Sequence, residues 1–310
     1  MTPIDTVIVA YRSDDVIGHA VATALELHGR VVVVDHGDGE SARLAGETGA
    51  VAIHDPSNPG FGTGQNHGLA FTDAEYVLLC NPDAEIVPEA IMAGVRLLVD
   101  RPDVAAVQGV ILNRATGLPE RSAGVELGPV HLVGRALGAK ALFGLPGVAL
   151  LARRSSALAD YAVRVPPEPV EVASLAATAT LVRRAAIEAA GGFDESYFLY
   201  GEDLDLCRRL RGAGWKLLAV PEVWATHTSG GSAESDWDRE TNWWRGTMQF
   251  AALWWSSPAW CVAVGSAAVR WARLGARHPG NARAALRALL ADPVHNRRKI
   301  GSTDPFRVSI

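Results

Sequence analysis

The chain has 310 residues, 48% of them hydrophobic and 20% charged, which suits one large or two small globular domains and excludes a disordered or collagenous chain. The formal charge of −5 argues against nucleic acid as the main partner. Three separated cysteines without a CxxC pair indicate neither a zinc site nor a disulfide framework. The N-terminus lacks the pattern of a signal peptide, so we expect a cytoplasmic protein.

Short apolar runs alternate with helix-like segments through the first third of the chain. The runs that predict strands are 6–11, 30–35, 50–54, 75–80 and 104–112. The segments that predict helices are 14–28, 39–48, 64–73 and 88–100. Fully apolar strands separated by helices predict a mostly parallel α/β sheet covered on both faces.

The rest of the chain is less regular at first and then helical. Residues 113–169 are rich in Gly and Pro and predict a hairpin and a surface excursion. The later expected elements are a return to the sheet at 170–182, helices at 183–191 and 202–213, a strand at 215–220, and helices from Asp238 separated at Pro258, Pro279 and Pro293. We therefore predict an α/β domain over residues 1–235 and a helical C-terminal region over 236–310.

Acidic residues follow two of the predicted strands, at the edge where ligands bind in open α/β sheets. Asp35 can accept hydrogen bonds from a nucleobase or ribose, or it can cap the next helix. Asp83 and Glu85, in Asn81-Pro-Asp-Ala-Glu85, are either ligands for Mg²⁺ or Mn²⁺ bridging phosphates or solvated carboxylates of a turn.

A glycine-rich segment, residues 58–68, precedes the third predicted helix. Glycines let a backbone approach a diphosphate closely, and a helix N-terminus favours its negative charge. The alternative is a loop with ordinary caps. The segment is not a Walker A loop, and no GxGxxG follows the first strand, which argues against a dinucleotide site.

Residues 191–210 carry the densest group of polar residues. If a helix starts near Gly201, Asp203 shares an apolar face with Leu206, Cys207 and Leu210, whereas Glu202 and Asp205 fall on another face, where Asp205 can pair with Arg209. Asp203 is then either a partner of the helix dipole or a positioned base. His227, taken alone, is more often a structural residue than a metal ligand.

Together these pieces resemble the family 2 glycosyltransferases of GT-A fold. The matching elements are Val7–Tyr11, Val33–Asp35, Asn58 with Gly60, Phe61 and Asn66, Asn81–Asp83, Gly191–Asp194 and Glu202–Asp205. The Asn-Pro-Asp version, with the run Phe198–Asp205, is similar to the bacterial branch that contains rhamnosyltransferases of cell-envelope assembly.

The resemblance implies an inverting transfer from a nucleotide-diphosphate sugar with Mg²⁺ or Mn²⁺. It assigns Asp203, with Glu202 beside it, to catalysis, and Asp83 with His227 to the metal. The expected donor-binding residues are Tyr11, Asp35, Asn58, Gly60, Phe61, Asn66, Asn81 and Asp83. The expected acceptor-side residues are Asp205, Trp224 and Arg245. Asn81 replaces the first Asp of the family's metal motif, and His36 stands where many members carry Asn.

The C-terminal region combines an uncharged stretch with a basic one. Residues 246–269 lack a formal charge and include three tryptophans, and residues 270–299 hold eight basic residues against the single acid Asp292. Three alternatives are open: a membrane span, docking on an anionic membrane surface, and a packed helix pair. We expect a peripheral protein of the inner membrane face, with a homodimer possible.

The leading hypothesis is a glycosyltransferase with a dTDP-L-rhamnose donor and a polyprenyl-diphosphate-linked or envelope glycan acceptor. A UDP-hexose donor on the same fold is one alternative. A non-catalytic nucleotide-sugar-binding scaffold is another, and the presence of Asp203 argues against it. A nucleotidyltransferase is disfavoured because its N-terminal glycine- and lysine-bearing signature is missing.

Overall fold

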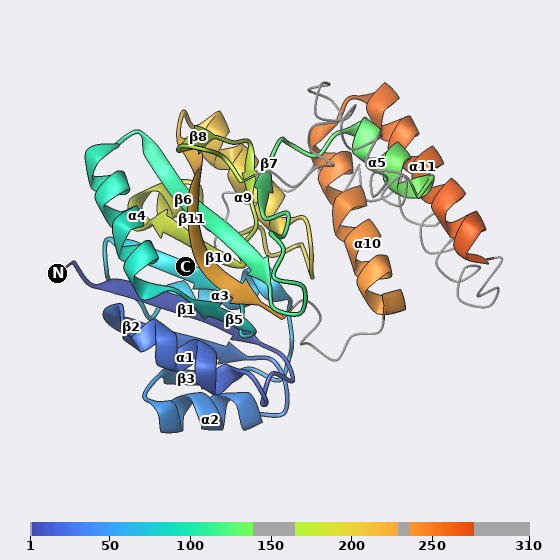
Figure 1. The fold of residues 1–310 in the computed structure, drawn as a ribbon. Coiled ribbons are helices and arrows are strands. Elements are labelled where there is room, and N and C mark those ends of the chain that lie inside the picture. Colours follow the sequence, from blue (N-terminus) through green and yellow to red (C-terminus); the bar gives the residue numbers. More distant parts are fainter. Residues whose placement is uncertain (1, 139–164, 229–235, 276–310) are drawn as a thin grey trace. The chain divides into compact units, whose positions relative to one another are not determined.

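A computed structural model describes residues 2–138, 165–228 and 236–275 (Figure 1). The chain divides into two compact units. The first comprises residues 1–125, 164–198 and 202–235, and the second comprises 126–163, 199–201 and 236–310.

A mostly parallel sheet forms the centre of the first unit. Its strands are β1 (Ile4–Ala10), β2 (His28–Asp35), β3 (Val51–His54), β4 (Tyr76–Cys80), β5 (Ala84–Ile86), β6 (Val104–Asn113), β8 (Val170–Glu171), β10 (Ala179–Arg183) and β11 (Lys216–His227). They lie in the order β3-β2-β1-β4-β10-β6-β11-β5, with β8 paired to β11. β5, β8 and β10 pair antiparallel to their neighbours, and the other pairings are parallel. The carboxyl ends of β1, β2, β4, β6 and β11 therefore meet at one edge.

Helices cover both faces of this sheet, as the alternating pattern predicts (Figure 1). The helices are α1 (Ile17–Leu25), α2 (Glu40–Thr48), α3 (Phe61–Leu69), α4 (Pro88–Asp100), α8 (Arg184–Ala189) and α9 (Glu202–Gly212). Apolar side chains of α1, α2 and α4 join one buried cluster, and those of α3, α8 and α9 join the other. Successive residues of β4 alternate between the two clusters, because side chains alternate across a strand.

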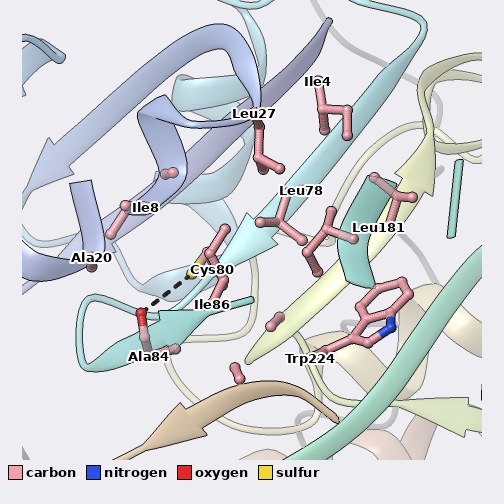
Figure 2. Close-up of a cluster of buried hydrophobic side chains, with 14 of the residues drawn as sticks. Ile4, Ile8, Ala20, Leu27, Leu78, Cys80, Ala84, Ile86, Leu181 and Trp224 are labelled. Carbon is pink, nitrogen blue, oxygen red and sulfur yellow. Dashed lines mark hydrogen bonds between the residues drawn. The ribbon is translucent and has the colours of Figure 1, made fainter. Parts of the chain in front are cut away.

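Trp224 of β11 lies inside the first cluster with Leu78 and Leu181 (Figure 2). Its indole is 1% exposed. Two glycines make room for it, because a Cβ at Gly94 would lie 2.6 Å from the ring and one at Gly109 would lie 2.1 Å from it. Trp224 is therefore a core residue, and the expectation that it lies on the acceptor side was wrong.

Three differences from the predicted elements bear on the site. No strand is predicted within Asn81–Glu85, a strand exit for which a turn is one of two readings, but β5 begins at Ala84 and pairs with β11. β11 was expected to end at Val220, but it continues to His227 through register shifts between Ala219 and Val223. α3 begins at Phe61 rather than residue 64, so most of the glycine-rich segment is helical.

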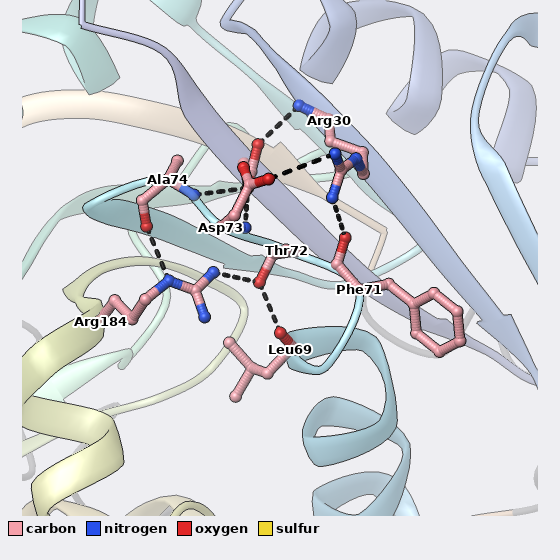
Figure 3. Close-up of polar contacts among 8 residues, drawn as sticks. Arg30, Leu69, Phe71, Thr72, Asp73, Ala74 and Arg184 are labelled. Carbon is pink, nitrogen blue, oxygen red and sulfur yellow. Dashed lines mark hydrogen bonds and ion pairs between the residues drawn. The ribbon is translucent and has the colours of Figure 1, made fainter.

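The strand ends opposite the polar edge are held by Asp5 of β1. Its carboxylate accepts hydrogen bonds from the backbone N–H groups of Arg30, Asp73 and Ala74 at 2.7, 2.8 and 2.9 Å (Figure 3). Arg184 donates to the carbonyl of Ala74 at 2.8 Å in the same view. Buried carboxylates are stable when charge-assisted bonds surround them, so Asp5 fixes the spacing of β1, β2 and the loop before β4.

In the second unit, α5 (Pro129–Ala136) and α11 (Ser257–Gly275) pack together and α10 (Asp236–Trp254) packs on α11. Leu132, Trp244 and Trp271 are among the buried residues of this unit's core. Glu240 accepts hydrogen bonds from Arg135, Arg270 and Trp244 at 2.6, 2.8 and 2.9 Å. In the described ranges no helix is long and apolar enough to cross a membrane. The break between α10 and α11 falls beside Pro258, as predicted, whereas Pro279 and Pro293 lie outside the described residues.

Two short strands complete the first unit. β7 (Ala123–Gly124) and β9 (Ser174–Leu175) form a separate antiparallel pair. β9 contacts the buried thiol of Cys207 on α9: the N–H of Leu175 donates to Cys207 Sγ at 3.3 Å. This contact ties α9 to the segment that precedes β10.

Candidate active site at the carboxyl edge of the sheet

Three of the predicted site residues meet beyond β4, β5 and β11. His227 ends β11 and pairs with Ala84 in the antiparallel ladder, so it lies beside Asp83. His227 Nε2 lies 3.0 Å from Asp83 Oδ1 and 3.4 Å from Asn81 Nδ2. The side chains of His227 and Asp83 are 14% and 9% exposed. The fold thus joins two motifs that are far apart in the sequence.

A fourth residue of this cluster, Glu120, was not predicted. Its Oε2 lies 2.8 Å from His227 Nδ1, and its Oε1 accepts a hydrogen bond from Asn113 at 2.8 Å. Burial lowers the pKa of His227, but the hydrogen bonds and negative charges of Asp83 and Glu120 outweigh it and raise that pKa above its ordinary value. No sequence pattern around Glu120 points to this position.

The donor set at this edge fits a divalent cation held partly by its substrate. Among residues 2–138, 165–228 and 236–275, no three His, Cys, Asp or Glu side chains converge as a complete ligand set. Asp83 and His227 offer one carboxylate and one imidazole. Mg²⁺ and Mn²⁺ are often held by one or two protein ligands together with phosphate oxygens, so a diphosphate would supply the remaining ligands.

A pair of neighbouring carboxyls opens α9. Glu202 is 4% exposed, lies against Gly62 of α3, and has no hydrogen-bond partner for its Oε2 in the described chain. Asp203 is half-buried, and its Oδ1 accepts a hydrogen bond from the N–H of Leu204 at 2.8 Å. Burial raises the pKa of both carboxyls; the charge of Asp203 raises that of Glu202 further, whereas the backbone bonds partly offset the rise at Asp203.

The predicted division of α9 into faces was partly wrong. Glu202 and Asp205 are more buried than Asp203, because α9 is covered on more than its apolar stripe. Asp205 is 2% exposed and pairs with Arg209 at 2.7 Å, so the predicted i,i+4 pair is confirmed. Arg209 also donates to the carbonyl of Ala190 after α8. Asp205 thus has a structural contact, and its acceptor role stays a prediction.

The glycine-rich segment packs against the polypeptide that precedes α9. Gly60 has a φ of +119°, and a Cβ there would lie 2.5 Å from the carbonyl oxygen of Phe198. Phe61 N–H donates to the same oxygen at 2.9 Å. Asn58 has a φ of +44° and lies half-buried at the turn before this contact. Only glycine fits at Gly60, so this part of the segment locks to Phe198.

The side-chain amide of Asn66 on α3 is hydrogen-bonded to the loop after α8. Phe193 N–H donates to its Oδ1 at 2.8 Å, and its Nδ2 donates to the Phe193 carbonyl at 2.9 Å and to Glu195 at 3.0 Å. Its amide is thus occupied by protein groups. Donor binding by Asn66 stays a prediction, and the geometry by itself gives it a positioning role.

Two more predicted donor residues lie at the ends of β1 and β2. Asp35 is 0% exposed, and its carboxylate accepts hydrogen bonds from the N–H groups of Gly37 and Ala42 at 2.7 and 3.1 Å. Asp35 thereby caps the start of α2, one of the two readings that the sequence left open. Tyr11 is half-buried with the guanidinium of Arg12 5.3 Å above its ring. Their contact with a donor stays a prediction.

Arg245 lies on an exposed face of α10 in the second unit. Its acceptor-side role stays a prediction. Within the first unit, the sequence-predicted residues outside the core thus fall into four groups: Asn81, Asp83 and His227 at one point, residues 58–66 against the chain before α9, Tyr11 and Asp35 after β1 and β2, and Glu202, Asp203 and Asp205 at the start of α9.

A family comparison matches residues 2–246 to "Glycosyltransferase like family 2". An N-acetylglucosaminyl-diphospho-decaprenol L-rhamnosyltransferase of Mycobacterium tuberculosis is 35% identical over 103 residues, 28% of this chain and 34% of that protein. The rhamnosyltransferase WbbL of Escherichia coli is 49% identical over 47 residues, 15% of this chain and 18% of that protein. The alignment thus spans about a third of the first relative.

Among solved structures, a crystal structure of GalNAc-T7 with UDP, GalNAc and Mn²⁺ is similar, with a TM-score of 0.57 and 13% identity over 96% of this chain and 58% of that one. The sheet order and flanking helices thus define the GT-A class of fold. With the family match over most of its length, the chain belongs to the family 2 glycosyltransferases.

Proposed function

We propose that this chain is an inverting glycosyltransferase that moves a sugar from a nucleotide-diphosphate donor to a hydroxyl group of a lipid-linked or envelope glycan. The family match supports the reaction class, and the names of the two relatives favour a rhamnosyl donor and a polyprenyl-diphosphate acceptor. The observation that carries the proposal is the half-buried carboxyl of Asp203 at the start of α9, beside the buried Glu202.

In the proposed mechanism Asp203 is the general base. Its carboxylate takes the proton of the acceptor hydroxyl while that oxygen forms a bond to the anomeric carbon. The bond from this carbon to the diphosphate breaks on the opposite face, and the nucleoside diphosphate leaves with the electron pair. General-base catalysis contributes about 10²–10⁴-fold in rate.

Asp83 and His227 would hold the divalent cation, with Asn81 beside them. When bound, the cation neutralises charge on the departing diphosphate. Asp83 supplies the charged oxygen ligand and His227 the imidazole. The Mn²⁺ in the GalNAc-T7 structure supports the choice of ion.

The test is transfer with purified full-length protein and a panel of donors, dTDP-L-rhamnose first and UDP-hexoses next. We expect Asp203→Asn to bind the donor normally in a thermal-shift assay and to lower turnover about 10²–10⁴-fold. Asp100→Asn, at an exposed carboxylate that ends α4, is the matched control. Near-normal turnover of Asp203→Asn would refute the assignment of the base. Absence of both transfer and donor hydrolysis would favour the scaffold alternative.

A chelator tests the metal. EDTA is expected to suppress turnover, and excess Mg²⁺ or Mn²⁺ is expected to restore it. Full activity in EDTA would remove Asp83 and His227 from the mechanism.

For the second unit, we propose peripheral contact with an anionic membrane surface. Val130, Val133 and Leu137 are 52%, 39% and 55% exposed and share one side of α5 and its C-terminal end. Val262 and Val269 of α11 are 40% and 44% exposed, and the basic residues 270–299 follow in the sequence. Apolar side chains beside arginines suit an interfacial site.

Flotation with vesicles tests this contact. We expect the protein to bind anionic vesicles. Added salt should weaken this binding, and so should the double substitution Val130→Glu with Val133→Glu. No binding at low salt would contradict the membrane contact and leave two alternatives, a packed helix pair and a homodimer. Size-exclusion chromatography with light scattering would detect the homodimer.

A further inference from the structure

We propose that Glu120 is a positioning residue that orients His227 so that its Nε2 faces Asp83 as a metal ligand. The inference rests on the metal site of the proposed function. It concerns a residue that lies outside every sequence motif of this chain. Glu120 reaches the site through the fold alone.

The turn after β6 brings Glu120 to the site. Asn113 N–H donates to the carbonyl of Leu118 at 2.9 Å, and Glu120 N–H donates to that of Ile111 at 2.7 Å. The chain therefore folds back along the end of β6, where Asn113 pairs with His227 in the parallel ladder to β11. Glu120 is placed beside the imidazole by backbone hydrogen bonds.

Both oxygens of the Glu120 carboxylate have partners that fix its direction. Oε1 accepts from the Asn113 amide at 2.8 Å, and Oε2 faces His227 Nδ1 at 2.8 Å. The Glu120 side chain is 21% exposed and that of His227 is 14% exposed. A partly buried, doubly held carboxylate leaves the ring little freedom to turn.

The consequence falls on the other ring nitrogen. When Nδ1–H donates to a carboxylate, the lone pair of Nε2 lies on the opposite side of the ring. The hydrogen bond also makes Nε2 a better metal ligand. Here that side holds Asp83 Oδ1 at 3.0 Å. Glu120 lies against Nδ1, away from this point, so it acts through His227 rather than as a ligand.

A nearby carboxylate provides a matched control. Glu85, for which the sequence left open a metal-ligand role, pairs instead with Arg114, is 44% exposed and faces Thr226 in the ladder between β5 and β11. It lies two residues from Asp83 in the sequence, and its removal changes the local charge by the same amount. It has no recorded contact with His227 among the described residues.

The experiment titrates the protein with Mn²⁺ in the presence of dTDP or UDP, because a diphosphate is expected to supply the remaining ligands, and follows protein-bound Mn²⁺ by water-proton relaxation enhancement. We expect Glu120→Gln to weaken Mn²⁺ binding about 10- to 100-fold, and Glu85→Gln to change it by less than about twofold, with both variants unfolding at similar temperatures. Asp83→Ala and His227→Ala are expected to remove this binding.

The variants separate two failures. If Asp83→Ala and His227→Ala bind Mn²⁺ like the wild type, or if the wild type binds none, the proposed metal site is wrong. If those two lose binding but Glu120→Gln keeps it within about twofold, only the role of Glu120 is overturned.

A second readout needs no variant of Glu120. With Mg²⁺ and the same nucleoside diphosphate bound, nitrogen-15 NMR of the histidine rings is expected to show His227 with its proton on Nδ1; the His227→Ala spectrum assigns the signal. A proton on Nε2 would overturn the inference.

Discussion

Replacing Glu202 by Gln tests whether its carboxyl is neutral in the resting protein. Glu202 is 4% exposed, and its Oε2 has no partner in the part of the chain that is described. Burial and the charge of Asp203 raise its pKa. Asp203 should therefore lose its proton first, which leaves Asp203 ionised and Glu202 neutral near pH 7. Gln has the shape of a neutral Glu.

The sign of the stability effect follows from the raised pKa. A carboxyl that binds its proton more tightly in the folded state stabilises the fold below its unfolded pKa, and this contribution is lost as pH rises through the folded value. Glu202→Gln removes the group that must ionise while buried. We expect the free energy of unfolding to rise by about 1–3 kcal/mol at pH 9, the usual penalty for an unsatisfied buried polar group, and to rise by less at pH 6, which lies above the unfolded pKa but closer to it.

Urea unfolding at pH 6 and pH 9 measures this difference, and turnover at pH 7 measures the chemistry. Glu188→Gln, at an exposed carboxylate of α8, is the control. Turnover of Glu202→Gln should stay within about tenfold of the wild type, far above that of Asp203→Asn. A loss as large as that of Asp203→Asn, or a gain in stability that is the same at both pH values, would refute the reasoning.

Two further predictions concern packing and ion pairing. Gly68→Ala should destabilise the first unit by about 1–3 kcal/mol in the same urea assay, because a Cβ there would lie 2.3 Å from Val7 Cγ1. Gly46→Ala on α2 is the control: its Cβ would meet only one atom, at 3.8 Å, so it should stabilise the fold by up to about 1 kcal/mol. Equal effects of the two substitutions would contradict the packing. Burial raises the pKa of Glu240, but Arg135 and the other donors lower it overall. Glu240→Gln should therefore lower the free energy of unfolding by about 1–3 kcal/mol at pH 7, and by progressively less as pH falls through the folded pKa. A loss of stability that persists in acid would contradict the ion pair.

β1, β4 and β6 could be predicted because they are buried along most of their length and read as apolar runs. β3 is an exposed edge strand, and only its run Val51-Ala-Ile53 indicates it. β11 could not be predicted in full, because Pro221 lacks the N–H that a central strand needs and a strand normally ends there. The register shifts between Ala219 and Val223 accommodate the proline, and pairing resumes to His227. β5 has three residues and no periodicity to detect.

The candidate site could be predicted where a motif is local. Asp83 follows a strand and Asp203 opens a helix, and both positions are visible in the sequence. Glu120 is brought in by a turn between Asn113 and Leu118 and by a bridge from Leu112 to Pro119. Such a contact depends on tertiary folding, and no spacing in the chain encodes it.

The motif residues differ in what their polar atoms do in the fold. The carboxylate of Asp35 accepts hydrogen bonds from the backbone of Gly37 and Ala42. The amide of Asn66 bonds the backbone of Phe193. Their loss should therefore lower stability along with activity. Asp203 makes only a local bond to the next residue in the described contacts, so its loss should lower activity without that cost. Residues that match a family motif thus include scaffold groups, and measuring unfolding together with turnover for each variant separates them from those that act on substrate.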